Sequence, residues 1–277
     1  MDLYTKNALQ CSRRTTRNYS TSFSLGVRLL SKKYRMPIHG IYGFVRFADE
    51  IVDTFHEHDK KRLLKEFRED TYKAIEDKIS TNPILHSFQY VVNKYSIEKE
   101  TIEAFLDSMQ MDLTHEDYNS QTFKKYVYGS AEVVGLMCLR VFTENNAKEY
   151  ERLKEPAMKL GEAFQKINFL RDLSSDYLER SRSYFPQIDP ASFSDADKAK
   201  IEEDIAIDFN EAYEGIKRLN KDSRLGVFLA YTYYKKLFLK IRQTKAKNIM
   251  SERYRISNTR KMALLFKGYI KHKMNLI

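Results

Sequence analysis

The chain has 277 residues, with 48 Lys and Arg against 38 Asp and Glu, a formal net charge of +10, and only 9 Gly and 5 Pro. This length can bury one large core, and the two cysteines, Cys11 and Cys138, supply neither a disulfide framework nor metal-ligand spacing, which indicates a reducing, cytoplasmic setting. Because the basic residues are scattered instead of massed in a tail, nucleic acid is not an expected partner, which leaves anionic substrates or an anionic membrane surface.

Long stretches repeat their apolar residues with a helical period, and no alternating strand pattern interrupts them. We therefore expect an all-α fold in a single domain, residues 1–277. The amino terminus lacks the apolar core of a secretory signal, and the longest apolar run, residues 133–139, is too short to cross a bilayer. We expect no transmembrane segment and no carboxy-terminal membrane anchor.

Residues 20–24, Ser-Thr-Ser-Phe-Ser, interrupt an amphipathic amino-terminal segment. Hydroxyl side chains compete for backbone hydrogen bonds and disfavour a helix interior, so we predict a loop between two helices here. The loop is either a plain connector or a donor of hydrogen bonds to a bound anion.

The next segment carries a polar stripe along one face of an otherwise apolar helix. Within an arc of about 60° on a helical wheel lie Tyr42, Arg46, Asp49 and Asp53. Because the rest of this helix is apolar, the stripe is hardly an ordinary water-facing surface. Its two acids, Asp49 and Asp53, are four residues apart. Arg46 could also simply pair with Asp49 or Glu50, one helical turn away.

The following segments have the character of scaffold. Residues 60–79 predict a charged amphipathic helix, and Asn82 followed by Pro83 predicts the start of another. Asp107 and Asp112 are five residues apart and fall on different helix faces, so we interpret them as structural or peripheral.

Residues 126–142 form the most apolar predicted helix, and its small residues recur at nearly helical spacing. These small residues are Gly129, Ser130, Ala131 and Gly135. They allow something to approach the backbone closely, either a neighbouring helix or an apolar ligand.

A second polar stripe spans an arc of about 80° on one predicted helix and consists of Gln165, Asn168, Asp172 and Asp176. Apolar residues lie directly beside it, so it borders the core. The residues expected to face water lie mostly on another arc: Lys159, Glu162 and Lys166.

The remainder of the chain is expected to be a loop followed by helices. Residues 180–194 contain proline and predict the loop, and Ser194 with Asp197 resembles a capping box that begins the next helix. Two further helices are expected at residues 224–250 and 257–274.

Two carboxylates one turn apart and turned inward repel each other and raise each other's pKa unless a cation lies between them. Oxygen ligands suit Mg²⁺, which is commonly shared with substrate phosphates, so two such helices predict a metal-diphosphate site. Arg46, Arg171 and Arg253 could bind the same oxygens, and the expected chemistry is ionisation of an allylic diphosphate. The 19 Tyr and 17 Phe could shield a carbocation, although aromatic residues more often fill the core. His56 and His58 project to different sides of a helix, and we assign no histidine to chemistry.

The second stripe and its flanks match the second signature of the squalene and phytoene synthase family, through Leu160, Gly161, Gln165, Asn168, Arg171, Asp172, Asp176, Arg182, Tyr184 and Pro186. Residues 42–53 resemble the first aspartate motif of that family, and residues 126–141 resemble its helix of small residues. The resemblance covers residues 15 to 255. It implies an all-α isoprenoid synthase bundle with a central cavity, two or three Mg²⁺ ions, with Mn²⁺ as a substitute, and head-to-head (1-1′) coupling of two prenyl diphosphates through a cyclopropyl intermediate.

The resemblance also implies roles for individual residues. The implied metal ligands are Asp49, Asp53, Asn168, Asp172 and Asp176, of which the four acids are also catalytic together with Tyr42 and Tyr234. The implied substrate-binding residues are Arg46, Gln165, Arg171, Arg253, Ser22, Phe23, Ala131, Val134 and Gly135, with Asn168 among them. Val127 and Glu132 depart from the family pattern, which usually has small residues there. Glu132 either faces away from the cavity or alters its polarity.

Within the family, the Asp-Glu-Ile-Val-Asp motif is most similar to phytoene synthases. It implies that two geranylgeranyl diphosphates are joined to phytoene through prephytoene diphosphate, the first committed step of carotenoid biosynthesis. The absence of a Gly-rich dinucleotide fingerprint is in keeping with a step that needs no NADPH, although it is weak evidence. The nearest alternative is a dehydrosqualene or squalene synthase that uses farnesyl diphosphate, and a non-enzymatic alternative is a basic helical scaffold or binding module. We expect a cytoplasmic protein, peripheral at the inner face of an anionic membrane, with a carotenoid desaturase as a downstream partner.

Overall fold

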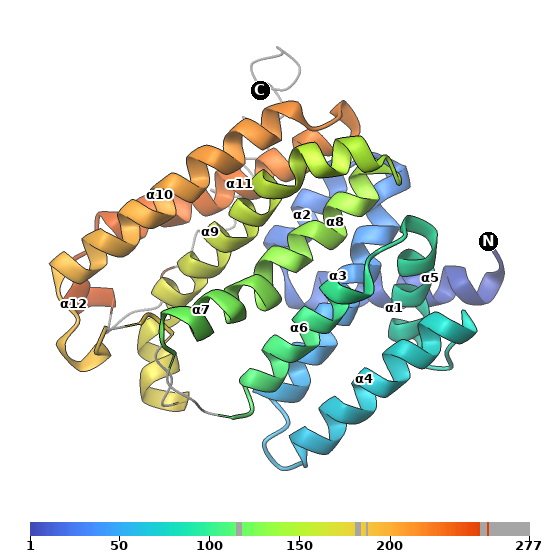
Figure 1. Cartoon of the computed structure of the whole chain (residues 1–277), viewed down its shortest axis with the longest axis horizontal. Helices are drawn as coiled ribbons and strands as arrows, with labels where there is room; N and C mark the ends of the chain where they lie inside the picture. Colours follow the sequence, from blue (N-terminus) through green and yellow to red (C-terminus); the bar gives the residue numbers. More distant parts are fainter. Residues whose placement is uncertain (115–117, 181–183, 187, 250–253, 255–277) are drawn as a thin grey trace.

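A computed structural model describes residues 1–114, 118–180, 184–186, 188–249 and 254. Within these ranges the regular elements are helices, and no strand occurs (Figure 1). The expected all-α fold is confirmed. In chain order the elements are α1 (Leu3–Tyr19), α2 (Thr21–Leu29), α3 (Lys32–Asp53), α4 (Lys60–Asp77), α5 (Pro83–Tyr95), α6 (Lys99–Met111), α7 (Ser120–Val127), a π-helical turn (Tyr128–Glu132), α8 (Val133–Thr143), α9 (Ala147–Arg180), a 3₁₀ turn (Pro190–Ser192), α10 (Asp195–Arg218), α11 (Lys221–Arg242) and α12 (Ala246–Ile249).

Two predicted helix starts are confirmed by their capping hydrogen bonds. The Asn82 side chain accepts the N–H of Ile84 at 3.0 Å, and Pro83 occupies the first position of α5. At the start of α10, Ser194 and Asp197 form the expected capping box, each side chain accepting the backbone N–H of the other. Each side chain satisfies a donor that a helix end otherwise leaves unpaired.

The loop predicted at residues 20–24 is wrong. Ser20 alone separates α1 from α2, and residues 21–24 form the first turn of α2. The Ser20 hydroxyl accepts the N–H of Phe23 at 3.2 Å, so it caps the helix that it was expected to interrupt. Hydroxyl residues disfavour a helix interior but favour its amino-terminal end, and the sequence did not distinguish the two positions.

The single helix predicted at residues 224–250 is also corrected. α11 ends at Arg242, and α12 begins at Ala246 after a short break. The Ala246 N–H donates to the Asp195 carboxylate at 2.7 Å, so a residue distant in sequence caps the new helix. The helix predicted at residues 257–274 lies outside the described residues.

The core consists of two main apolar clusters. One surrounds α3, where the Phe44 ring stacks on Phe88 of α5 with 3.8 Å between ring centroids. The other joins α9, α10 and α11 through residues such as Ile167 and Phe209, both with no exposed surface. α8 packs against α3 on one side and α9 on the other, so it links the two clusters.

His39 of α3 is a buried polar residue in this core, with 5% of its surface exposed. One of its ring nitrogens, Nδ1, lies 3.0 Å from the Thr16 hydroxyl of α1. Burial, together with the positive charges of Arg13 and Arg17, lowers the pKa of His39 to about 4. The imidazole is therefore neutral near pH 7 and serves as a hydrogen-bonded link between α1 and α3.

The three residues predicted to face water on α9 instead meet α10. Lys166 is only 2% exposed, and its ammonium lies 2.7 Å from a carboxylate oxygen of Asp208 and 2.7 Å from one of Glu162. Lys159 lies 3.0 Å from Asp208. The prediction failed because acids on α10, including Asp204, neutralise these lysines, and nothing in the sequence of α9 identifies that partner.

Among the described helices, none is long and apolar enough to cross a membrane.

Candidate active site

A cavity of about 360 Å³ lies between α2, α3, the π-helical turn, α8, α9, α10 and α11. Its walls are mainly apolar, with a few hydroxyl and amide groups at one place. Among the predicted site residues, the cavity is lined by Phe23, Tyr42, Ala131, Val134, Gly135, Gln165, Asn168 and Tyr234. Ser22 lies half-buried in the first turn of α2 and is not part of this lining.

The cavity has a polar end and an apolar end. α8 and α9 run along it in opposite directions, so the start of one helix lies beside the end of the other. Ser130 lies opposite Gln165 with 3.1 Å between their side chains, whereas Phe142 and Leu153 line the cavity some 12 residues away along each helix. At 1.5 Å per residue the lining of α9 from Leu153 to Asn168 extends over about 22 Å. The space is therefore a long tunnel lined by hydrocarbon.

Hydrogen bonds link the polar groups of three helices at the polar end. The Tyr234 hydroxyl of α11 donates to the Asn168 carbonyl oxygen at 3.3 Å, the Asn168 amide donates to Gln165 at 3.4 Å, and the Gln165 amide donates to Ser130. Asn168 thereby holds Tyr234 at the wall of the tunnel. Burial raises the pKa of Tyr234, so its hydroxyl stays protonated near neutral pH.

Ser130 belongs to a π-helical turn that interrupts the predicted continuous helix at residues 126–142. Extra residues in a helical turn re-aim the side chains, and such turns are frequent at functional sites. Here Ser130 and Ala131 line the tunnel, whereas Glu132 does not. Close helix packing is shown, because a Cβ on Gly161 would lie 2.6 Å from the Ala131 carbonyl oxygen. Gly135 also lines the tunnel, and the approach of an apolar ligand there stays a prediction.

Glu132 and Val127, the two departures from the family pattern, lie away from the tunnel. Val127 is buried in the second core cluster. Partial burial raises the pKa of Glu132 to about 7, and the nearby negative charge of Glu162 adds to this shift, while Lys159 opposes it. Glu132 is thus outside the tunnel lining, and the charges that act on it include those of Glu162 and Lys159 on α9.

Two pairs of stacked aromatic rings flank the polar end. Phe23 stacks on Tyr42 with 4.8 Å between centroids, and Phe164 stacks on Tyr234 with 3.9 Å between centroids. All four side chains line the tunnel. Burial raises the pKa of Tyr42 to about 12, so this hydroxyl is also protonated near pH 7. Aromatic faces attract cations, and protonated hydroxyls donate hydrogen bonds to anions.

The two aspartate pairs lie beyond this end of the tunnel. Asp49 and Asp53 follow Tyr42 by two and three helical turns on α3, and Asp172 and Asp176 follow Asn168 by one and two turns on α9. None of the four lines the tunnel itself. Asp176 is 6% exposed and Asp49 is half-buried, so neither stripe is an ordinary water-facing surface.

Both predicted arginines of the described region contact these acids. Arg171 binds Asp172 through two hydrogen bonds, of which the one from Nε is 2.9 Å long. Arg46 forms an ion pair with Glu50 and lies 3.9 Å from Asp49. The Nε of Arg46 is buried and has no hydrogen-bond partner among the residues that the structure describes. Arg253 lies outside the described residues.

Negative charge accumulates around Asp49. Withdrawal from water raises the pKa of Asp49 to about 7; Arg46 opposes this shift, while the negative charges of Asp53 and Asp112 add to it. An acid so placed gains from a bound cation.

Of the two interpretations of Asp112, structural or peripheral, the structure supports the first. It caps the carboxyl end of α6, is 5% exposed, and accepts hydrogen bonds from the Tyr126 hydroxyl at 2.9 and 3.0 Å and from the Tyr184 hydroxyl at 3.4 Å. The Tyr184 ring stacks on Phe169 of α9 with 4.2 Å between centroids. Since the charge of Asp112 also acts on Asp49, this group connects the acid end of α3 with α9. Asp107 pairs with an arginine of α4 and is likewise structural.

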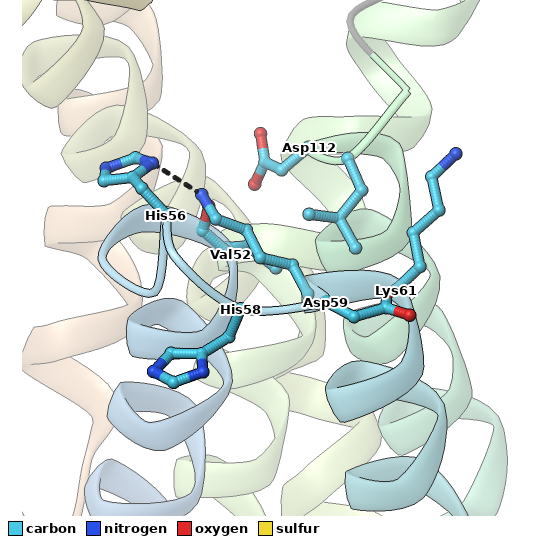
Figure 2. A pocket seen from close by; sticks show the side chains of 8 residues that line it. Val52, His56, His58, Asp59, Lys61 and Asp112 are labelled. Carbon is cyan, nitrogen blue, oxygen red and sulfur yellow. Dashed lines mark hydrogen bonds between the residues drawn. The ribbon is translucent and has the colours of Figure 1, made fainter.

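Figure 2 shows a second cleft, of about 400 Å³, beside Asp112 and the end of α3. The Lys60 ammonium donates to the Val52 carbonyl oxygen at 3.0 Å and lies 3.0 Å from Nδ1 of His56. His58 also lines this cleft, so the two histidines flank it without a shared ligand position. That no histidine takes part in the chemistry stays a prediction.

Another acidic group lies between α9 and α10, where Glu162, Asp204 and Asp208 have oxygens within 4.8 Å of one another. Three such carboxylates could hold a metal ion. The Lys166 ammonium, however, bonds to all three and already supplies the positive charge. Metal binding by the aspartate stripes of α3 and α9 stays a prediction.

Comparison with known proteins agrees with this geometry. A family model described as squalene/phytoene synthase matches residues 16–260. The chain is 28% identical to phytoene synthase 3, chloroplastic, of Zea mays over 92% of its own length and 64% of the maize protein. It is 25% identical to the 4,4'-diapophytoene synthase of Staphylococcus haemolyticus over 88% of this chain and 90% of that protein. A crystal structure of a dehydrosqualene synthase in complex with ligand superposes with a TM-score of 0.81 over 98% of both chains at 20% identity, which supports the fold.

Proposed function

The chain belongs to the squalene and phytoene synthase family, and from this we propose that it joins two prenyl diphosphates head to head in a metal-dependent reaction. In the proposed reaction, two geranylgeranyl diphosphates give phytoene through prephytoene diphosphate, the first committed step of carotenoid biosynthesis. The observation that carries the proposal is an apolar tunnel whose polar end is lined by Tyr42 of α3 and Asn168 of α9, the two helices that carry the aspartate pairs in the turns that follow.

The side chains at the acid end suit Mg²⁺. The proposed ligands offer only oxygen atoms, which Mg²⁺ prefers, and the raised pKa of Asp49 reflects mainly its withdrawal from water, to which the negative charges of Asp53 and Asp112 add. We propose Asp49 and Asp53 on α3, and Asn168, Asp172 and Asp176 on α9, as ligands of two or three ions, with Mn²⁺ as a substitute. Bound metal would neutralise the diphosphate and stabilise the charge that develops on it as a leaving group.

The arginines of the site would bind diphosphate oxygens. Two like charges 4 Å apart repel by about 1 kcal/mol in water and about 4 kcal/mol at an effective dielectric constant of 20, so acids alone would reject this substrate. Arg46 lies in the first stripe and Arg171 lies next to Asp172 of the second, and the Nε of Arg46 is a donor without a partner in the described part of the chain. Guanidinium groups suit phosphate oxygens because they bind them with paired hydrogen bonds.

The polar end of the tunnel would handle the carbocation. The protonated hydroxyls of Tyr42 and Tyr234 would lie near the reacting carbons, and the stacked rings of Phe23 and Phe164 would present π-faces to the positive charge. The apolar walls exclude water, which would otherwise capture the cation. Gln165, which donates a hydrogen bond to Ser130, would keep α9 and the π-helical turn in place at this end.

The length of the tunnel supports a C20 substrate. An extended carbon chain advances about 1.3 Å per bond of about 1.5 Å, so the main chain of a geranylgeranyl group extends about 19 Å and that of a farnesyl group about 14 Å. The lining of α9 from Leu153 to Asn168 extends over about 22 Å, which suits the longer group.

A C15 substrate is the second candidate. The dehydrosqualene synthase structure covers almost the whole chain with a TM-score of 0.81, and the Staphylococcus relative is named for a diapophytoene product. A farnesyl group would also fit the tunnel, but it would leave part of the apolar end unfilled.

Product identification tests the proposal. Purified protein would be incubated with Mg²⁺ and either geranylgeranyl or farnesyl diphosphate, with and without NADPH, and the hydrocarbons identified by mass spectrometry. We expect phytoene from the C20 substrate, with no requirement for NADPH. Turnover of only the C15 substrate would replace phytoene with dehydrosqualene or squalene, and no turnover of either would favour a basic helical scaffold.

The lipophilic substrates and product, with the net charge of +10, support transient docking on the inner face of an anionic membrane. A carotenoid desaturase would then take the product from the same surface. Co-sedimentation with vesicles of anionic or neutral lipid tests the docking. Equal lack of binding to both would contradict it.

A further inference from the structure

We infer that Leu30, held over the bare α-carbon of Gly226, closes the apolar end of the tunnel and sets the longest prenyl chain that the site accepts. This inference rests on the proposed function, since it concerns the tail of the same substrate. It adds the feature that selects substrate length, far from the reacting groups.

Leu30 lies where several helix ends meet. It follows the last residue of α2 and is 3% exposed, and it lines the tunnel together with Phe142 at the end of α8, Leu153 near the start of α9 and Leu219 at the end of α10. The polar groups of the tunnel lie at the other end, away from Leu30. A prenyl chain whose diphosphate is bound at the aspartates would therefore reach this group last.

The backbone of Leu30 is fixed on both sides. Its N–H donates to the Val27 carbonyl oxygen at 3.2 Å, and its carbonyl oxygen accepts a hydrogen bond from Nε of Arg35 at 2.8 Å. The next residue, Ser31, donates its N–H to Asp222 at the start of α11 at 2.8 Å. Movement of Leu30 is thus confined to its side chain.

Gly226 of α11 leaves the space that this side chain fills. A Cβ at this position would lie 2.4 Å from Cδ2 and 2.8 Å from Cγ of Leu30, and 2.9 Å from the carbonyl oxygen of Gly26. Carbon atoms pack at about 3.5–4.0 Å, so a methyl group here would displace the end of Leu30 by about 1 Å. The displaced side chain would move into the tunnel, because the other sides of Leu30 pack closely within the main core cluster.

Substrate length should respond to this pair in opposite directions. Gly226→Ala pushes Leu30 into the tunnel and shortens it, whereas Leu30→Ala removes the obstructing atoms and lengthens it. One methylene in a tight apolar pocket changes selectivity by about tenfold or more. In the double variant the added methyl no longer meets Leu30 and keeps only its contact with the Gly26 carbonyl oxygen at 2.9 Å. Its preference should therefore approach that of Leu30→Ala, which is the non-additivity expected of residues in contact.

Binding of unreactive analogues provides the test. Calorimetry with Mg²⁺ would measure the affinities of the C15, C20 and C25 prenyl thiolodiphosphates for the full chain and its variants. We expect Gly226→Ala to lower the C20-to-C15 affinity ratio by about tenfold, Leu30→Ala to raise the C25-to-C20 ratio, and the double variant to follow Leu30→Ala. Lys236→Ala, an exposed change on the same helix, is the matched control.

Unchanged ratios in Leu30→Ala and Gly226→Ala would overturn the inference, as would a wild-type chain that binds none of the analogues. Leu30→Ala removes atoms and Gly226→Ala adds them, so a folding defect in one leaves the other to decide, and circular dichroism identifies such a defect. A chain that binds the analogues with the expected ratios but condenses no prenyl diphosphate would retain this inference and refute the proposed function.

Discussion

The ion cluster between α9 and α10 predicts a large and specific loss of stability when its central cation is removed. In Lys166→Met the aliphatic stem of the side chain is kept and the ammonium is lost. That ammonium is almost fully buried, as is the Asp208 carboxylate 2.7 Å away, with 3% and 1% of the respective side chains exposed. The variant therefore leaves negative charge in the interior without its closest partner.

The expected cost follows from the charges that remain. Breaking a buried ion pair by removing one partner costs about 3–5 kcal/mol. Lys159 still lies 3.0 Å from Asp208 and 2.8 Å from Glu162, so it compensates part of the charge, and we expect the lower end of this range, about 3 kcal/mol. Burial already raises the pKa of Asp208, and loss of Lys166 should raise it further. Because the folded variant then holds this proton more tightly than the unfolded chain, the deficit should shrink as the pH falls from 7 towards 5.

Urea denaturation followed by circular dichroism would measure the free energy of unfolding at both pH values. Lys200→Met, an exposed change on α10, is the control at each pH and should lie within about 0.5 kcal/mol of the wild type. Adding Asp208→Asn to Lys166→Met should restore part of the loss, since it removes the stranded charge. A Lys166→Met variant as stable as Lys200→Met at pH 7 would refute the argument that buried charge holds these helices together.

Three further predictions concern the site and the core. Asp49→Asn and Asp172→Asn should each lower turnover by about 10²-fold or more without changing the helical circular dichroism signal. Asp107→Asn, outside the stripes, is the control and should leave turnover unchanged. Wild-type rates in both stripe variants would contradict the metal-site hypothesis. Chelation with EDTA should abolish turnover and added Mg²⁺ should restore it, so activity that survives dialysis against EDTA would argue against a required metal. The folded-state pKa of His39, about 4 against an ordinary 6.5, means that the unfolded chain binds this proton first, so stability should fall by about 3 kcal/mol between pH 7 and pH 4. His39→Gln, which can still hydrogen-bond Thr16, should flatten that pH dependence of the unfolding free energy, and an unchanged slope would contradict it.

The fold was predictable where the signal lies within one segment. Helical periodicity, the Asn82 cap and the capping box at Ser194 depend on residues within a few positions of each other, and each is confirmed. The failures involve partners distant in the chain. From its position in the sequence Lys166 resembles a water-facing lysine. Only the packing of α10 against α9 buries it and supplies the Asp208 carboxylate that pairs with it.

The site was predictable to a similar limit. Helical spacing grouped Gln165 with Asn168, and both line the tunnel with Tyr42 and Tyr234 from other helices, although their roles remain proposals. The link from Asp112 to α9 was missed because the spacing of Asp112 from Asp107 was judged within a single helix. One signal was available: an acid at the carboxyl end of a helix opposes the helix dipole, so a side chain kept there has a compensating partner elsewhere.

The tunnel also could not be derived from helix patterns, because its depth depends on where helix ends meet. α9 contributes to both of its ends, Leu153 at the apolar end and Asn168 at the polar one, followed by Asp172. A single helix of 34 residues, anchored to α10 by buried ion pairs, therefore carries residues of both the proposed diphosphate site and the apolar end. Leu30, which follows α2, and Gly226 of α11 lie outside α9, so substitutions there alter the depth of the tunnel and leave the backbone of α9 in place. One or two substitutions could thus change the length of the substrate that the site accepts without disturbing the groups proposed to ionise the diphosphate. This is a physical reason why one fold can serve both C15 and C20 substrates.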